Sequence, residues 1–60
     1  MRLLIIDDHV LFREGLVSLI SRQPDMQVVG EGGSVSETVV LARKLRPDLI
    51  LLDFNLPDGT

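Results

Sequence analysis

Three aspartates stand where two apolar segments of this 60-residue sequence end. Asp7 and Asp8 follow the apolar run at residues 3–6, and Asp53 follows the run at residues 49–52. A short, continuous apolar run that stops at an acid is typical of a strand buried on both faces that ends on reaching solvent. Carboxylates from the ends of two such strands could together hold a metal ion that takes oxygen ligands.

Carboxylates gathered in this way repel one another, by about 4 kcal/mol per pair at 4 Å and an effective dielectric constant near 20. Protonation of one acid would relieve the repulsion. A hard divalent cation would relieve it as well, and Mg²⁺ suits a site of two carboxylates, a carbonyl oxygen and waters. From spacing alone a third interpretation stays open, in which each aspartate merely ends its strand in a solvated loop.

The sequence between these runs alternates between helix and strand patterns. Residues 27–30 form a weaker third strand candidate, entered through the turn at Pro24-Asp25 and left through a turn at the glycines 30, 32 and 33. An amphipathic helix is predicted over about residues 9–22. Its apolar side holds Phe12, Leu16, Leu19 and Ile20, and its polar side holds Arg13, Glu14, Ser18 and Arg22.

A second helix is predicted to begin at a capping box formed by residues 34–37. In this motif Ser34 accepts a hydrogen bond from the amide near Glu37, and Glu37 reaches back to the amide of Ser34. Pro47 ends the helix, because the residue before a proline is disfavoured in helical dihedral angles. The predicted apolar face consists of Val35, Val39, Ala42 and Leu45.

The order strand, helix, strand, helix, strand predicts an α/β fold with a parallel sheet and right-handed crossovers. We expect the strand order 2-1-3, the βαβαβ portion of a flavodoxin-like doubly wound sheet with one helix on each face. A switch point then lies between strands one and three, where ligands of open α/β sheets bind. Asp7, Asp8 and Asp53 are the residues expected there.

Three segments of the sequence carry a family pattern. They are Asp7-Asp8-His9 after the first apolar run, Leu-Phe-Arg-Glu-Gly-Leu at 11–16, and Pro-Asp-Leu-Ile-Leu-Leu-Asp-Phe-Asn-Leu-Pro at 47–57. Together they resemble the receiver domain of two-component response regulators of the LuxR/NarL type. The resemblance covers essentially the whole chain, and the joint spacing of the acidic pair and the second acidic segment is highly specific.

The resemblance implies roles for individual residues. Asp53 would be the phosphoacceptor, Asp8 a direct Mg²⁺ ligand, and Asp7 a ligand directly or through water. Asp53 would also touch the metal, and the backbone carbonyl of Asn55 would complete the protein's share of ligands. The implied protein is a switch rather than an enzyme, with a sensor histidine kinase as partner and transcription controlled through an attached DNA-binding domain.

The pattern also has gaps. Val10 stands where this subfamily often has proline, which should affect only the entry to the first helix. The family needs a Ser or Thr after a fourth strand and a Lys after a fifth, and the sequence reaches neither. Residues 1–60 are therefore expected to be the N-terminal part of a receiver domain, without the last two strands and any DNA-binding domain.

Composition excludes several function classes. The net charge is −3 and the six Lys and Arg residues are scattered, so these residues offer no basic stripe to nucleic acid. No cysteine is present, which removes disulfides and thiolate sites and fits a reducing compartment, so a cytoplasmic location is expected. The first apolar run is four residues long, too short for an export signal or a membrane span.

Two other functions are compatible with parts of the sequence. Residues 52–55 and 58–60 faintly resemble the nucleophile loop of haloacid-dehalogenase-like phosphatases, but that family has a second Asp where Asn55 stands. A fragment without chemistry is the other alternative, since a third strand without a fourth presents unpaired backbone, which predicts self-association. His9 is expected at the solvent-facing start of the first helix, because the chain has no other His and no Cys to complete a metal site with it.

Overall fold

The computed structural model describes residues 1–53 and 56–58 of the chain. Three strands alternate with two helices along the sequence. The strands are β1 (Arg2–Ile6), β2 (Gln27–Gly32) and β3 (Leu49–Leu52), and the helices are α1 (Val10–Ser21) and α2 (Val35–Leu45). Neither helix in this described part is long enough and apolar enough to cross a bilayer.

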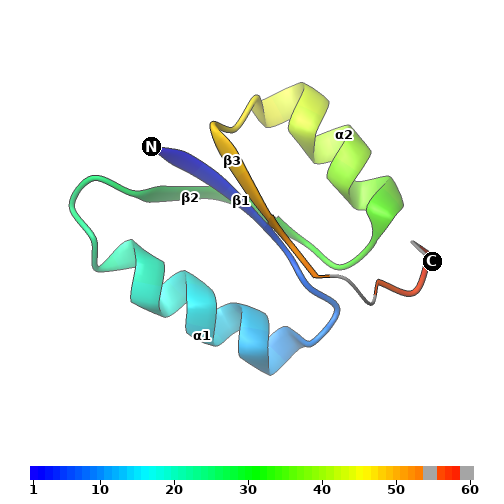
Figure 1. The fold of residues 1–60 in the computed structure, drawn as a ribbon, viewed down its shortest axis with the longest axis horizontal. Helices are drawn as coiled ribbons and strands as arrows, with labels where there is room; N and C mark the ends of the chain where they lie inside the picture. Colours follow the sequence, from blue (N-terminus) through cyan, green and yellow to red (C-terminus); the bar gives the residue numbers. More distant parts are fainter. Residues whose placement is uncertain (54–55, 59–60) are drawn as a thin grey trace.

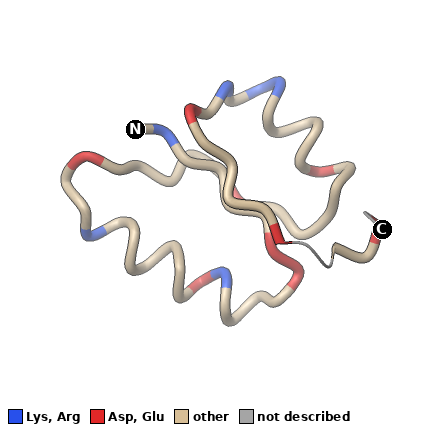
Figure 2. Tube along the Cα trace, viewed as in Figure 1, with Lys and Arg blue, Asp and Glu red and all other residues tan. Residues whose placement is uncertain are grey.

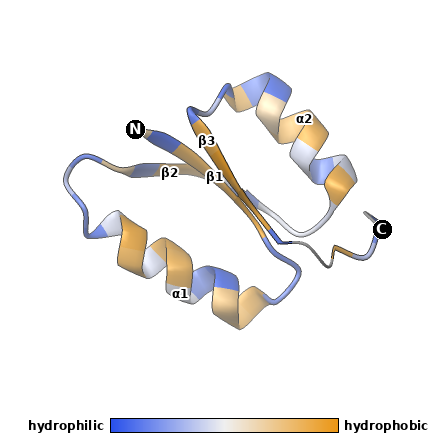
Figure 3. Cartoon of the chain, in the orientation of Figure 1, coloured by the Kyte–Doolittle hydropathy of each residue, from blue (hydrophilic) through white to orange (hydrophobic). Residues whose placement is uncertain are grey.

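The sheet is parallel with the strand order β2-β1-β3, as the sequence predicted. Helices α1 and α2 cover opposite faces of the sheet (Figure 1). The central strand β1 supplies most of the core, because it alone has a strand on each side and a helix above and below. Its apolar residues at 3–6 are at most 2% exposed. In Figure 3 most of β1 and β3 is hydrophobic, whereas β2 is mixed.

Helix α1 lies within the predicted range and is one residue shorter at each end, but some of its side chains are oriented differently. Leu16 and Ile20 are half-buried, as predicted, whereas Phe12 and Leu19 remain 59% and 61% exposed. Arg13 was assigned to the solvent side, and this prediction is wrong. Its guanidinium reaches over the sheet edge and donates to the carbonyl oxygens of Asp7 and Gly32, both at 2.8 Å. Helical periodicity placed Arg13 on the solvent side, but the carbonyl acceptors at the strand ends draw its side chain toward the sheet.

Strand β2 is longer than predicted and includes two of the glycines assigned to a turn. Gly30 and Gly32 pair with Leu4 and Ile6 of β1, and the register shifts between Leu3 and Leu4. A Cβ atom on Gly30 would lie 2.6 Å from Cδ1 of Leu45, so the missing side chain allows α2 to pack closely on the sheet. Gly30 and Gly32 therefore serve the packing of the helix on the sheet. A single sequence does not distinguish this role from a role in a turn.

Helix α2 begins at the predicted cap, with one difference in the partner of Glu37. The Ser34 hydroxyl accepts from the amide of Glu37 at 3.2 Å, while the Glu37 carboxylate accepts from the amide of Gly33 rather than from that of Ser34. The buried face also differs, because Val39 is 46% exposed and Leu41 packs on the core instead. The helix ends at Leu45, two residues before Pro47, as predicted.

Candidate functional site

The carboxyl ends of β1 and β3 lie side by side at one edge of the sheet. Parallel pairing places Ile6 opposite Leu52, and the amide of Asp53 donates to the carbonyl oxygen of Ile6 at 2.9 Å. The residues that follow these strands are therefore neighbours in space although 46 positions separate Asp7 from Asp53. Figure 2 shows their acidic segments adjacent at this edge.

The structure brings Asp7, Asp8 and Asp53 together with His9. One ligand atom from each of these four side chains lies within 4.8 Å of the others. We call these four residues the acidic cluster. The Asp7 side chain is 10% exposed, that of Asp53 18% and that of Asp8 33%, so the cluster runs from the protein interior to solvent.

His9 belongs to this cluster, which sequence reasoning missed. It caps α1 and its side chain is 71% exposed, as expected for a helix start. Its Nδ1 atom, however, lies 3.1 Å from oxygens of both Asp7 and Asp8. The hydrogen bond to Asp7, followed by the negative charge of Asp8, raises the pKa of His9 above 6.5. An acidic pair directly before the histidine was the sequence signal for this contact.

Asp7 is held by its backbone as well as by its neighbours. Its amide donates to the carbonyl oxygen of Gly32 at 3.0 Å, and its carbonyl oxygen accepts from Arg13. One carboxylate oxygen accepts from the amide of His9 at 2.8 Å. These contacts fix the backbone on both sides of the Asp7 side chain.

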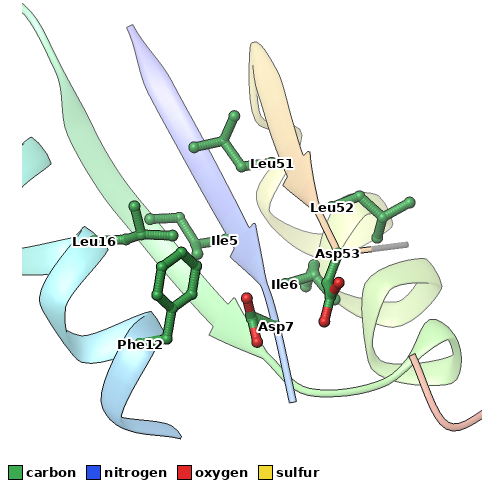
Figure 4. A pocket seen from close by; sticks show the side chains of 8 residues that line it. All are labelled: Ile5, Ile6, Asp7, Phe12, Leu16, Leu51, Leu52 and Asp53. Atoms are coloured by element: carbon green, nitrogen blue, oxygen red, sulfur yellow. The ribbon is translucent and has the colours of Figure 1, made fainter. Parts of the chain in front are cut away.

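An open groove leads from the acidic cluster along the sheet on the α1 side (Figure 4). Apolar side chains of β1, β3 and α1 form its walls, and the carboxylates of Asp7 and Asp53 lie at one end. A ligand at the cluster would therefore meet solvent on one side and apolar surface on the other. The lining residues are Ile5, Ile6, Asp7, Phe12, Leu16, Leu51, Leu52 and Asp53.

The donor set fits a hard divalent cation. Three carboxylates supply oxygen atoms, which Mg²⁺ and Ca²⁺ prefer over nitrogen and sulfur ligands. Their mutual repulsion at these distances favours a positive charge among them, and the imidazole of His9 already lies in that position. Asn55, whose backbone carbonyl the family resemblance implied as a further ligand, lies outside the described residues.

The sequence matches a known protein family. Residues 3–60 match the family described as response regulator receiver domain. The chain is 45% identical over 58 residues to the DNA-binding transcriptional activator DevR/DosR of Mycobacterium tuberculosis, covering 97% of this chain and 27% of that protein. It is 51% identical over 55 residues to the nitrate/nitrite response regulator protein NarL of Escherichia coli, covering 92% of this chain and 26% of that protein.

Solved structures agree in fold. A two-component response regulator of the LuxR family from Aurantimonas sp. superposes with a TM-score of 0.91 at 38% identity, over 98% of this chain and 43% of that one. The response regulator domain of Thermotoga maritima CheB gives a TM-score of 0.93 at 39% identity, over 98% and 46%. The chain spans about a quarter of the length of the curated relatives named above. With its sheet order, its strand-end acids and a match over residues 3–60, the chain belongs to the response regulator receiver domain family.

Proposed function

We propose that this chain is a phosphoacceptor that receives a phosphoryl group on Asp53 in a Mg²⁺-dependent reaction. The observation that carries the proposal is the meeting of Asp53 with Asp7 and Asp8 within 4.8 Å at the edge of the sheet. Asp53 is the acid of this cluster that follows β3, and 18% of its side chain is exposed to an incoming donor. The family membership supports the same role.

The reaction forms one bond and breaks one bond. A carboxylate oxygen of Asp53 attacks phosphorus in line with the leaving group, giving an acyl phosphate. With a phosphohistidine donor, the P–N bond breaks and its electron pair returns to the donor imidazole. A bound Mg²⁺ would reduce the negative charge on the transferring group and so lower the barrier.

Asp7 and Asp8 would hold the ion, with Asp53 as a third ligand and the backbone carbonyl of Asn55 as a fourth. Asp7 is the most buried of the three acids and its backbone is fixed by hydrogen bonds. Asp8 is more exposed and can adjust to the ion. A buried, fixed ligand beside an exposed one suits Mg²⁺, which keeps several waters when it binds to protein.

The names of the relatives suggest the partner and the output of this phosphoacceptor. The donor would be a sensor histidine kinase, and the phosphorylated form would control transcription through a DNA-binding domain elsewhere in a longer protein. A cytoplasmic location fits both partners. The charge distribution agrees with DNA contact elsewhere, since the net charge of this chain is −3.

The test is covalent labelling of the protein that contains this chain. Incubation with Mg²⁺ and acetyl phosphate or phosphoramidate should add one phosphoryl group on Asp53, detected by mass spectrometry, and beryllofluoride should form an adduct there. Asp53→Asn should abolish both. Asp25→Asn, which removes an exposed acid outside the cluster, should leave labelling unchanged. Labelling of Asp53→Asn equal to wild type would refute the proposal.

A phosphatase is the less favoured alternative. It would use Asp53 as nucleophile but would leave the Asp7 and Asp8 pair without a role, and the family match supports the switch instead. Turnover of a generic phosphate ester that depends on Asp53 would revive it.

A second proposal concerns the 60-residue chain by itself, which we propose self-associates. Strand β3 pairs with β1 on one side only, and Leu49, Ile50 and Leu52 are 43%, 36% and 55% exposed. An exposed apolar strand edge is a template for pairing with another copy. Sedimentation of the isolated chain should show oligomers, and a stably folded monomer would contradict this.

A further inference from the structure

Arg13 is the single Lys or Arg residue of α1, and its side chain reaches the carboxyl ends of the strands. Its Nη1 atom donates to the carbonyl oxygen of Asp7 and to that of Gly32, each at 2.8 Å. Its side chain is only 19% exposed, although arginine is mostly found exposed and is almost never fully buried unless it is paired. One guanidinium thus joins the first turn of α1 to the ends of β1 and β2.

These two acceptors are already linked to each other. The carbonyl oxygen of Gly32 accepts from the amide of Asp7 at 3.0 Å as well as from Arg13. The peptide units on both sides of the Asp7 Cα atom are therefore held, one by Gly32 and the other by Arg13. Hydrogen bonds from a charged donor are shorter and stronger than neutral ones, so the contact of Arg13 resists displacement of this backbone.

The carboxylate that pairs with Arg13 comes from outside the acidic cluster. The Nε atom of Arg13 lies 3.3 Å from a carboxylate oxygen of Glu31, close enough for an ion pair, although it makes no hydrogen bond. Glu31 is on β2 and is not one of the four cluster residues. An effect of Arg13 on the cluster would therefore act through the backbone of Asp7.

We propose that Arg13 is a positioning residue for the acidic cluster, holding the backbone of Asp7 so that Asp7 and Asp8 present their carboxylates to a divalent cation together. The inference rests on the proposed function for the identity of the ion. It goes beyond that function because Arg13 is not one of the four cluster residues and contacts the backbone of Asp7. Residues that orient metal ligands typically change metal affinity by 10-fold to 100-fold when they are removed.

The experiment measures Mg²⁺ affinity rather than phosphorylation. Calorimetric titration of the full-length protein with MgCl₂ should show binding to Arg13→Gln weakened by about 10-fold or more. Arg13→Lys, which keeps one charged donor, should lie between wild type and Arg13→Gln. Amide hydrogen exchange at Asp7 should be faster in Arg13→Gln, since this amide shares its acceptor with Arg13.

Two control variants separate positioning from charge and from general stability. Arg22→Gln removes an exposed cation at the other end of α1 and should keep wild-type affinity. Glu31→Gln removes the ion pair but keeps the contacts of Arg13 with Asp7 and Gly32, and should also keep it. A loss in Glu31→Gln equal to that in Arg13→Gln would overturn the inference in favour of an electrostatic effect.

Other outcomes are equally decisive. Wild-type Mg²⁺ affinity in Arg13→Gln, whatever its melting temperature, would overturn the inference and leave Arg13 a purely structural residue. If Arg13→Gln does not fold, wild-type affinity in the folded Arg13→Lys variant together with unchanged exchange at Asp7 would overturn it. Failure to label Asp53 in a protein whose Mg²⁺ affinity depends on Arg13 would refute the proposed function and support this inference.

Discussion

The same substitution, glycine to alanine, should have opposite effects at two positions of this fold. Gly15 lies in the middle of α1, and an added Cβ would meet no atom within 4 Å. Gly30 lies in β2, and an added Cβ would be 2.6 Å from Cδ1 of Leu45 and 3.2 Å from Cδ1 of Leu4. No described glycine has a positive φ, so backbone strain is the same at both positions and packing decides the sign.

The magnitudes follow from these contacts. Gly15→Ala should raise the free energy of unfolding by about 1 kcal/mol, the difference in helix propensity between the two residues. Gly30→Ala should gain about 0.5–1 kcal/mol from the lower entropy of the unfolded chain, but crowding Leu45 and the fully buried Leu4 should cost about 1–3 kcal/mol. We expect a net loss of about 1 kcal/mol at Gly30 and a difference of about 2 kcal/mol between the variants.

Urea unfolding of the two variants and the wild type measures both values, provided that the slope m is unchanged. In a Leu45→Ala background the closest contact is absent, so Gly30→Ala should become neutral or stabilising, and this double-mutant cycle isolates the contact. If Gly30→Ala stabilises the protein as much as Gly15→Ala, then Leu45 moves aside freely. In that case the close packing of α2 on β2 does not require a glycine.

Three further predictions concern caps and charges. Ser34→Ala should lower the free energy of unfolding by about 1 kcal/mol through loss of the α2 cap, whereas Ser18→Ala, on the exposed side of α1, should be neutral or slightly stabilising in the same urea assay. Hydrogen bonds from the amides of Val35 and Ser36 lower the pKa of Asp58 below 3.8. The contribution of Asp58 to stability is therefore complete above pH 3.8 and is lost as the pH falls through the lowered pKa. The difference in Tm between wild type and Asp58→Asn should shrink over this pH range, and a difference independent of pH would contradict the prediction. Free Mg²⁺ at about ten times Kd should raise the free energy of unfolding of the wild type by about 1.4 kcal/mol. Asp8→Asn has less repulsion in the cluster, so it should be at least as stable as wild type without Mg²⁺ and should be stabilised less by Mg²⁺. Equal thermal shifts with Mg²⁺ in both proteins would count against Asp8 as a ligand.

Several features of the fold could be predicted because local sequence determines them. The apolar runs at 3–6 and 49–52 form strands, as short continuous apolar runs do in parallel sheets, although only the first run is buried on both faces. Ser34 begins α2 because the capping box depends on atoms within four residues of one another. The strand order 2-1-3 followed from the alternation of strands and helices together with the family resemblance.

Other features depend on atoms far apart in the sequence, and only the tertiary structure decided them. Gly30 and Gly32 lie in a strand because α2 packs against them, which their neighbours in sequence do not reveal. Arg13 turns toward the sheet because two carbonyl oxygens, from β1 and β2, meet within reach of its guanidinium. The sequence by itself determined which acids end which strands, while strand pairing decided that Asp53 stands beside Asp7 and that His9 and Arg13 join them. The physical reason is range: caps and apolar runs act over a few residues, whereas hydrogen bonds between strand ends act only once the sheet has formed.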